Sequence, residues 1–464
     1  MTTPDDAAAV VAVDFGASSV RVCRVELGQA PRLSVVHRHP HAPVDDGSGA
    51  LRWDWPRLLA ETERGLAAAL EVGPVASIGV DTWGVDYGLL DARGELVAAP
   101  VSYRDGRTAG YEAVVDRLGG AAALYGVTGV QLQPFNTVFQ VAAHDPAELE
   151  RARHLVMLPE LVVHHLTGEV VGERTSAGTT ALVDIATGRW AAELATHVGL
   201  DPAVLPELLP AGTRVGTWQG VPVHLVGGHD TASAVVAMGA GAGPRPAFVS
   251  SGTWLLAGRE QPAPDLSAEA RTANFTNEVG ALGGVRFLKN LAGAWLLDQC
   301  RPAWGDPPIA DLLDAAATVS VPSGSTQLLD PGDTRFLHPD DMLGDVTDAL
   351  ALPRDAPPPL VARLVVESLA AATARVLSGL PGERPSHVHV FGGAQSRLYE
   401  RALAERTELP VLPGPTEATA LGNALVQGIA LGRYGGLADA RRCLDSLDEQ
   451  AGRRVVLPAT KATS

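Results

Sequence analysis

An acidic residue ends the first apolar run of the chain, at a position where a carboxylate could help to bind a metal ion. The run AAAVVAV covers residues 7–13 and leads into the segment DFGASSVR, which begins at Asp14. Asp14 could hold a hydrated Mg²⁺, and Gly16 with the small residues 17–19 could offer N–H and hydroxyl groups to phosphate oxygens. The alternative is that the acid and the serines only cap a turn between two strands.

A second acidic residue, Asp230, follows a pair of glycines and opens a run of small residues. The apolar segment PVHLV leads through Gly227 and Gly228 into HDTASAV, which is expected to start a helix. The glycines would let a substrate reach the carboxylate, which could accept the proton of a sugar hydroxyl during phosphoryl transfer. An acid here also has a plain structural role, because it stabilises a helix N-terminus by about 1 kcal/mol.

A tryptophan and a glycine interrupt the strand-like segment IGVDTWGVDYGLL, which begins at residue 78. Trp83 offers a flat apolar wall, and Gly84 allows a ligand to approach the backbone. The charged segment YRDGRT follows at residues 103–108. This pattern favours a pocket for a small polar ligand such as a sugar.

Three glycine-rich turns, DFGASS, SSGT and FGGAQS, follow apolar strand-like runs. The first is expected to join two strands, because the residues after it alternate, and the chain has no GxxxxGK[ST] motif. Three such turns fit a nucleotide that lies across a cleft between two domains. The segment at residues 248–254 echoes the first turn and predicts a duplicated fold, with domains at residues 1–240 and 241–464 and a hinge in the glycine- and proline-rich residues 238–247.

Helices are predicted where apolar residues recur at a period of 3.6. The expected helical segments are residues 55–70, 110–124, 139–166 and 359–380, and a tail from residue 438.

The composition limits the class of protein. A chain of 464 residues with 46% hydrophobic residues is expected to form a two-domain α/β protein. The net charge of −17 argues against nucleic acid and anionic membranes as partners. Three scattered cysteines and the lack of a signal-like or membrane-spanning segment predict a cytoplasmic protein.

Nine segments together resemble the FGGY carbohydrate kinases, and most closely the rhamnulokinase branch of that family. In chain order they are DFGASSVR, GVDTWGVDYGLL, YRDGRT, QPFNTVFQ, GHDTASAV, SSGTW, NFTNE, LKNLAGAWLL and GPTEATALGNA. The resemblance covers about residues 11–432. It implies an α/β fold of two actin-like (ribonuclease H-like) ATPase domains with the active site in the interdomain cleft. It also implies ATP and Mg²⁺, and transfer of a phosphoryl group from ATP to O1 of L-rhamnulose, a step of L-rhamnose catabolism.

The resemblance also implies roles for single residues. Asp230 matches the proton acceptor. Apart from the resemblance, the position of Asp14 at the end of a strand predicts that it holds Mg²⁺ through water. The implied substrate-binding residues are Trp83, Gly84, Asn136, His229, Asp230, Thr231 and Asn290. The implied ATP-binding residues are Ala17, Ser18, Ser19, Val20, Arg21, Thr253, Asp298, Gly392 and Gly393.

Two of these positions depart from the family pattern. Val20 stands where the family usually has glycine, which predicts a stiffer hairpin tip. Asp298 stands where the nearest relatives have glutamine, and an acid there would repel phosphate but could serve ribose hydroxyls.

Several alternatives stay open from the sequence. The acceptor could be another ketose or deoxy-sugar, such as L-fuculose or L-xylulose. A non-catalytic sugar sensor or an actin-like chaperone ATPase are rivals from other classes, and a monomer is not distinguished from a dimer. His37, His39 and His41 alternate along an extended segment, so a zinc site is a further alternative.

Overall fold

The computed structural model describes residues 9–45, 47, 49–239, 245–320, 327–337, 339–450 and 455–458, and the side chains of 445–450 are not described. Its residues form two compact units. The first unit comprises residues 1–240, 260–287 and 418–447, and the second comprises residues 241–259, 288–417 and 448–464. The division of the chain into two continuous domains, residues 1–240 and 241–464, stays a prediction. Residues 240–244 of the predicted hinge lie outside the described residues.

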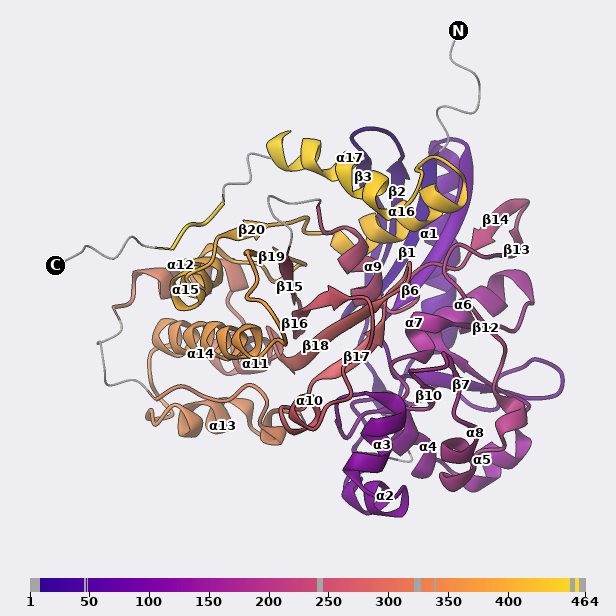
Figure 1. The fold of residues 1–464 in the computed structure, drawn as a ribbon, viewed down its shortest axis with the longest axis horizontal. Helices are drawn as coiled ribbons and strands as arrows, with labels where there is room; N and C mark the ends of the chain where they lie inside the picture. Colours follow the sequence, from indigo (N-terminus) through magenta and orange to yellow (C-terminus); the bar gives the residue numbers. More distant parts are fainter. Residues whose placement is uncertain are drawn as a thin grey trace, which may run out of the picture. The chain divides into compact units, whose positions relative to one another are not determined.

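The first unit is built on a sheet of order β13-β14-β6-β1-β2-β3 (Figure 1). Its strands are β1 (Ala9–Gly16), β2 (Ser19–Glu26), β3 (Arg32–Pro40), β4 (Val44–Asp45), β5 (Leu51–Arg52), β6 (Val75–Thr82), β7 (Tyr87–Leu90), β8 (His154–Met157), β9 (Gly172–Glu173), β10 (Val183–Asp184), β11 (Arg189–Trp190), β12 (Leu208–Leu209), β13 (Arg214–Trp218), β14 (Val221–His224) and β17 (Thr276–Val279). Its helices are α1 (Trp55–Val72), α2 (Glu112–Arg117), α3 (Ala121–Thr128), α4 (Thr137–Ala142), α5 (Pro146–Arg151), α6 (Leu158–Thr167), α7 (Arg174–Ala177), α8 (Ala192–His197), α9 (Asp230–Val236), α10 (Ala268–Thr272), α16 (Ala418–Ala430) and most of α17 (Leu437–Gln450).

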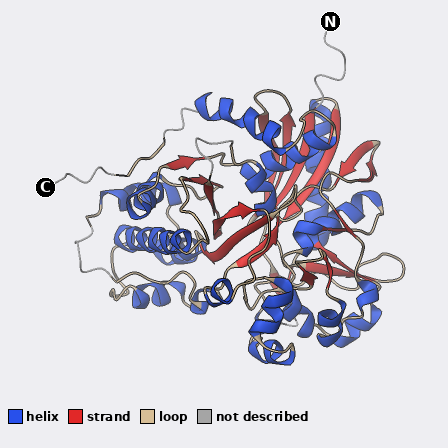
Figure 2. Cartoon of the chain, viewed as in Figure 1, coloured by secondary structure: helices blue, strands red, loops and turns tan. Residues whose placement is uncertain are grey.

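The second unit holds the strands β15 (Pro246–Ser251), β19 (His387–Phe391) and β20 (Val411–Pro413) and most of β16 (Trp254–Gln261) and β18 (Val285–Ala292). Its helices are α11 (Trp295–Cys300), α12 (Ile309–Thr318), α13 (Met342–Ala349), α14 (Pro358–Ser378) and α15 (Arg397–Thr407). Figure 2 shows both kinds of element in each unit.

Both units arrange their central strands in the same way. In the first, β1 pairs antiparallel with β2 and parallel with β6. In the second, β15 pairs antiparallel with β16 and parallel with β19. A long helix precedes the parallel strand each time, α1 before β6 and α14 before β19. The predicted duplication of a strand-turn-strand element is therefore present in the fold.

Burial explains the central strands and their covering helices. Residues 9–15 of β1 are all buried, as expected for a central strand covered on both faces. Helix α1 packs on β2 and β3, and α16 packs on β1 and β6. Asp54 caps α1 by accepting a hydrogen bond from the backbone N–H of Arg57, and buried residues recur at helical spacing from Trp55 to Ala69.

Two of the predicted helical segments are wrong in detail. Residues 139–166 contain α4, α5 and α6, but strand β8 lies between the last two and pairs antiparallel with β7. Residues 155–157 form a strand because their apolar side chains are buried by pairing with the neighbouring strand, and this outweighs their helical pattern. Residues 110–124 hold two helices, because Gly119 and Gly120 both adopt positive φ and end the first.

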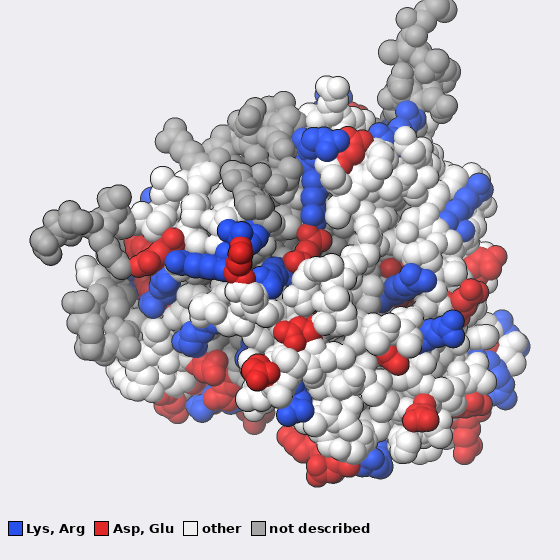
Figure 3. All heavy atoms as spheres, in the orientation of Figure 1, with Lys and Arg blue, Asp and Glu red and all other residues white. Residues whose placement is uncertain are grey.

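Acidic and basic side chains are interspersed on the face drawn in Figure 3. Among the described residues, no helix is both long and apolar enough to span a membrane. All three cysteines are buried, and within the described part of the chain none of them forms a disulfide bond.

Candidate functional site

Asp230 is the first residue of α9, and its two carboxylate oxygens have different surroundings. Oδ1 accepts hydrogen bonds from the backbone N–H (2.5 Å) and hydroxyl (3.1 Å) of Thr231, and it lies 3.3 Å from Nε2 of His229. No hydrogen bond to Oδ2 is found within the described part of the chain, and the side chain is 27% exposed. Asp230 is thus a first-turn acid whose Oδ2 is open to a ligand.

His229 connects Asp230 to a buried ion pair that the sequence did not single out. Nδ1 of His229 lies 3.1 Å from Nη2 of Arg286 and 3.3 Å from Oε2 of Glu278. Arg286 and Glu278 are themselves paired at 2.9 Å, and both are buried. Glu278 belongs to the motif NFTNE, but nothing in the local pattern marked Arg286.

The glycines before His229 serve packing. A Cβ at Gly228 would lie 3.0 Å from Oε1 of Glu160 and 3.1 Å from Oε2 of Glu173, and the Gly228 N–H donates to Glu173. A Cβ at Gly227 would lie 2.9 Å from the backbone N of Ser233. The expectation that these glycines clear a path for substrate is therefore wrong, because buried side chains and the helix backbone fill that space.

The acids that pack against Gly228 are fully buried. Burial raises the pKa of Glu160 well above its usual value, and Glu173 raises it further. Burial likewise raises the pKa of Glu173, against the effect of hydrogen bonds from Thr175. These two acids therefore lie behind the Asp230 loop and support its backbone.

Asp14 lies beside a second carboxylate at the ends of two parallel strands. β1 and β6 place Asp14 level with Asp81, and both side chains are fully buried. Nη2 of Arg21 lies 2.7 Å from Oδ2 of Asp14, and Asn423 donates to Oδ2 of Asp81 at 2.6 Å. Burial raises the pKa of Asp81 well above its usual value, and the Asp14 charge adds to the rise. Sequence reasoning missed Asp81 and Asn423 as site residues.

This pair of carboxylates suits a divalent cation. The two carboxyl groups lie level with one another on neighbouring strands, and carboxylate oxygens are ligands that hard divalent cations prefer. Among the described residues, no group of three or more acidic, histidine or cysteine side chains has metal-binding geometry. Magnesium at Asp14 therefore remains a prediction.

The first glycine-rich turn joins two strands, as predicted. β1 ends at Gly16 and β2 starts at Ser19, which leaves Ala17 and Ser18 as the tip. Val20 is fully buried and pairs with Phe15, so its side chain packs inside the first unit. The contact of this hairpin position with ATP and the stiffer hairpin tip stay predictions.

Trp83 belongs to a buried aromatic cluster. Its Nε1 donates to Oδ2 of Asp86 at 3.0 Å, and Nε1 of Trp53 donates to the same oxygen at 2.8 Å. The two indole rings lie 4.5 Å apart, and Trp83 is 6% exposed. Burial raises the pKa of Asp86 to about 6. Asp86, which the sequence did not single out, therefore fixes the orientation of the Trp83 ring, which is expected to form a wall of the ligand pocket.

The lack of a side chain at Gly84 accommodates a protein side chain. A Cβ there would lie 2.8–3.0 Å from the Thr179 side chain, whose hydroxyl accepts a hydrogen bond from the Val85 N–H. Val85 has a φ of 68°, and its carbonyl accepts a hydrogen bond from Thr137 at 2.7 Å. The expectation that the missing side chain of Gly84 makes room for a ligand is therefore corrected. Asn136 is buried and accepts a hydrogen bond from the Gln133 N–H.

The remaining predicted residues lie in the second unit, where three turns meet. The Thr253 carbonyl accepts hydrogen bonds from the N–H groups of Gly293 (3.0 Å) and Trp295 (3.2 Å). Gly392 has a φ of 105°, and a Cβ there would lie 2.5 Å from the Ser251 carbonyl. The structure thus brings the SSGT turn, the start of α11 and the FGGAQS turn together.

The other second-unit residues are more open. Asp298 lies on α11, where it is 42% exposed and 3.5 Å from Nη1 of Arg301. Asn290 is half-buried in β18, and Gly393, which follows Gly392, has no atom within 4 Å of an added Cβ.

The predicted histidine cluster is divided between two environments. His37 lies 2.9 Å and His39 3.9 Å from the carboxylate of Glu61 in α1. His41 instead packs against Trp53 and Trp83, and burial lowers its pKa to about 4. The three imidazoles therefore do not share one partner.

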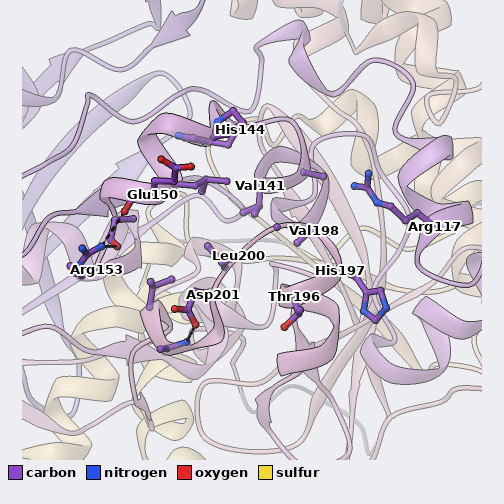
Figure 4. A pocket seen from close by; sticks show the side chains of 17 residues that line it. Arg117, Val141, His144, Glu150, Arg153, Thr196, His197, Val198, Leu200 and Asp201 are labelled. Atoms are coloured by element: carbon purple, nitrogen blue, oxygen red, sulfur yellow. Dashed lines mark hydrogen bonds between the residues drawn. The ribbon is translucent and has the colours of Figure 1, made fainter.

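A large hollow of about 890 Å³ lies elsewhere in the first unit. Figure 4 shows His144, Glu150 and Arg153 on one side of it and Arg117 and His197 on the other. It contains none of the predicted site residues. The tight contacts around Asp230 and Asp14, and not the size of a cavity, mark the candidate site.

Two family models match consecutive parts of the chain. The N-terminal domain of the FGGY family of carbohydrate kinases matches residues 9–239, and the C-terminal domain matches residues 247–431. The chain is 35% identical over 465 residues to a rhamnulokinase of Enterococcus faecalis, covering 94% of this chain and 92% of that protein. It is 36% identical over 450 residues to a rhamnulokinase of an Enterobacter species, with coverage of 93% and 91%.

Solved structures resemble the fold at low sequence identity. A ligand-bound xylulose kinase from Lactobacillus acidophilus has a TM-score of 0.78 and 15% identity, covering 97% of this chain and 94% of that one. Glycerol kinase of Plasmodium falciparum with ADP has a TM-score of 0.71 and 14% identity, with coverage of 98% and 95%. Together with the family matches, these likenesses confirm the predicted two-domain actin-like fold.

Proposed function

Since the chain belongs to the FGGY family of carbohydrate kinases, we propose that its acceptor is L-rhamnulose, phosphorylated by ATP at O1 to give L-rhamnulose 1-phosphate. The observation that carries the choice of sugar is the match, over more than nine-tenths of both chains, to two proteins named rhamnulokinase. The segments DTWGVD, PFNT and HDTASAV, which resemble that branch, support it.

Asp230 is the proposed proton acceptor. Two hydrogen bonds from Thr231 to Oδ1, with His229 lying nearby, hold the carboxylate in one orientation, so Oδ2 is presented to the hydroxyl that attacks the γ-phosphorus. In a loose, in-line transfer the proton leaves the hydroxyl late. General-base assistance of this kind contributes roughly 10²–10⁴-fold to the rate.

Asp14 and Asp81 are the residues proposed to hold Mg²⁺, Asp14 through water. When bound, Mg²⁺ would neutralise charge on the β- and γ-phosphates. Arg21 would then balance Asp14 from the side of the hairpin, and Asn423 would orient Asp81 through its 2.6 Å hydrogen bond.

ATP is proposed to contact the hairpin tip at Ala17, Ser18 and Ser19 and the second-unit turns at Thr253, Gly392 and Gly393. The small side chains at the tip and the glycines would allow backbone N–H groups to approach phosphate oxygens. The same proposal includes the substrate roles of Trp83, Gly84, Asn136, His229, Thr231 and Asn290 and the ATP contacts of Val20, Arg21 and Asp298.

An ADP-release assay with Mg·ATP over L-rhamnulose, L-fuculose and L-xylulose tests the choice of sugar. The highest kcat/KM is expected for L-rhamnulose. A higher kcat/KM for either of the other two ketoses would refute L-rhamnulose as the acceptor, but it would not affect the membership of the FGGY family.

Asp230→Asn tests the proton acceptor. Turnover should fall at least about tenfold with ATP binding kept, because an amide cannot accept the proton. Asp145→Asn makes the same change at another helix start, where the side chain accepts a hydrogen bond from the Ala147 N–H, and it should leave turnover unchanged. A smaller loss in Asp230→Asn than tenfold would refute the assignment.

A further inference from the structure

Arg286 lies directly behind the His229–Asp230 pair. It projects from β18 and is 1% exposed. Its Nη2 contacts both Nδ1 of His229 (3.1 Å) and Oε2 of Glu278 (2.9 Å), and its Nε donates to the Val279 carbonyl at 3.3 Å. Burying a charge is costly, so the contacts of a fully buried arginine must offset the loss of its hydration.

The contact between Arg286 and His229 fixes where the imidazole carries its proton. A guanidinium can only donate hydrogen bonds, so Nδ1 of His229 must accept with its lone pair. A neutral ring then carries its hydrogen on Nε2, which faces Oδ1 of Asp230 at 3.3 Å without hydrogen-bond geometry in this structure. The Arg286 contact has hydrogen-bond geometry, whereas the Glu278 carboxylate only lies near Nδ1, at 3.3 Å.

Arg286 is placed to act through His229 and not on a ligand. Its Nη1 is enclosed and has no hydrogen-bond partner among the described residues. Because no surface of the guanidinium is open, a sugar could not reach it without displacing the strand.

We propose that Arg286 is a positioning residue for phosphoryl transfer: it holds His229 as the Nε2–H tautomer, so that an N–H group and not a lone pair faces Oδ1 of Asp230 while Oδ2 is left to the sugar hydroxyl. The proposal rests on the proposed role of Asp230 as proton acceptor. Glu278 holds the guanidinium in place, and Asp230, Glu173 and Glu260 are the further charged groups that act on it.

The tautomer can be measured directly in the unaltered protein. Long-range ¹H–¹⁵N correlation spectra of ¹⁵N-histidine-labelled protein, with His229→Gln to assign the signal among the 13 histidines, should show Nδ1 without a proton. A proton on Nδ1 of His229 would overturn the proposal without any altered protein having to fold.

Arg286→Met keeps the length of the side chain and removes its donors. The nearby Glu278 should then draw a proton to Nδ1, and kcat should fall about 10- to 100-fold while the KM for ATP changes little. Arg286→Lys keeps one donor and should recover part of both kcat and the Nε2–H signal. An unchanged tautomer together with an unchanged kcat in Arg286→Met would overturn the proposal.

A matched control separates positioning from simple loss of stability. Arg24→Met removes another buried arginine, which donates to the carbonyls of Gly73 and Pro74. It should lower the melting temperature while keeping the His229 signal and kcat. Should Asp230→Asn prove fully active, the proposed role of Asp230 as proton acceptor fails, whereas the tautomer result still decides whether Arg286 controls His229.

Discussion

Replacement of Gly422 by alanine should move the helix that begins with Asp230. An ideal Cβ at Gly422 of α16 would lie 1.7 Å from the Ser233 carbonyl oxygen and 2.6 Å from its carbon, both on the backbone of α9. Real Cβ contacts are essentially never shorter than 3.0 Å, so the two helices would have to separate by about 1.3 Å. A backbone carbonyl within a helix cannot turn aside as a side chain can.

The expected size of the effect follows from that displacement. Overpacking of this kind typically costs about 1–3 kcal/mol, against a gain of up to about 1 kcal/mol from the better helix propensity of alanine. A shift of about 1 Å at a reacting group can reduce turnover by about 10²-fold. We therefore expect Gly422→Ala to lower both the free energy of unfolding and kcat.

Urea unfolding followed by tryptophan fluorescence, together with the ADP-release assay, measures both effects. Gly126→Ala is the matched control, because this glycine lies in helix α3 and an added Cβ would have nothing within 4 Å. It should raise stability by about 0.5–1 kcal/mol and leave kcat unchanged. If Gly422→Ala were as stable and as active as Gly126→Ala, the inferred close contact of α9 and α16 would be refuted.

Two further predictions concern the DTWGVD segment. Gly84→Ala should lower the free energy of unfolding by about 1–3 kcal/mol through its clash with Thr179, and Thr179→Gly in the same protein should restore part of it; a normal stability with only a raised sugar KM would favour ligand space instead. Asp86 binds a proton more tightly when folded, since burial raises its pKa from 3.8 to about 6, so its contribution makes stability fall as pH rises from about 4 to about 6. Asp86→Asn should remove this pH dependence, which is worth up to about 3 kcal/mol of unfolding free energy. Urea unfolding at pH 4.5 and 6.5 measures it, and an equal change in unfolding free energy between the two pH values in both proteins would contradict the prediction.

The sequence predicts those residues of the candidate site whose role is indicated by their immediate neighbours in the chain. Asp230 could be predicted because a glycine pair and small residues surround it, and the β1–β2 hairpin because alternation follows the DFGASS turn. Arg286, Asp81 and Asn423 could not, because their partners lie far away along the chain. Asn423 and Asp81, for example, are separated by 342 positions. A local pattern shows that a side chain is buried but not what it meets.

The glycines illustrate a different limit. Gly84 and Gly228 were recognised as positions that need glycine, but the reason was wrong in both cases. A sequence shows that space is required beside a backbone, and it does not distinguish a ligand from a neighbouring side chain. Thr179 and the pair Glu160 and Glu173 occupy that space.

The placement of α16 in the first unit has a consequence for biosynthesis. The central sheet of that unit begins at residue 9, yet α16, which covers β1 and β6 and orients Asp81, is not made until residues 418–430. At about 5–20 residues per second, Asn423 emerges roughly 20–70 s after Asp81. During that interval the nascent sheet lacks its cover, so a ribosome-bound chain would expose apolar strand surface until residues 418–430 are translated.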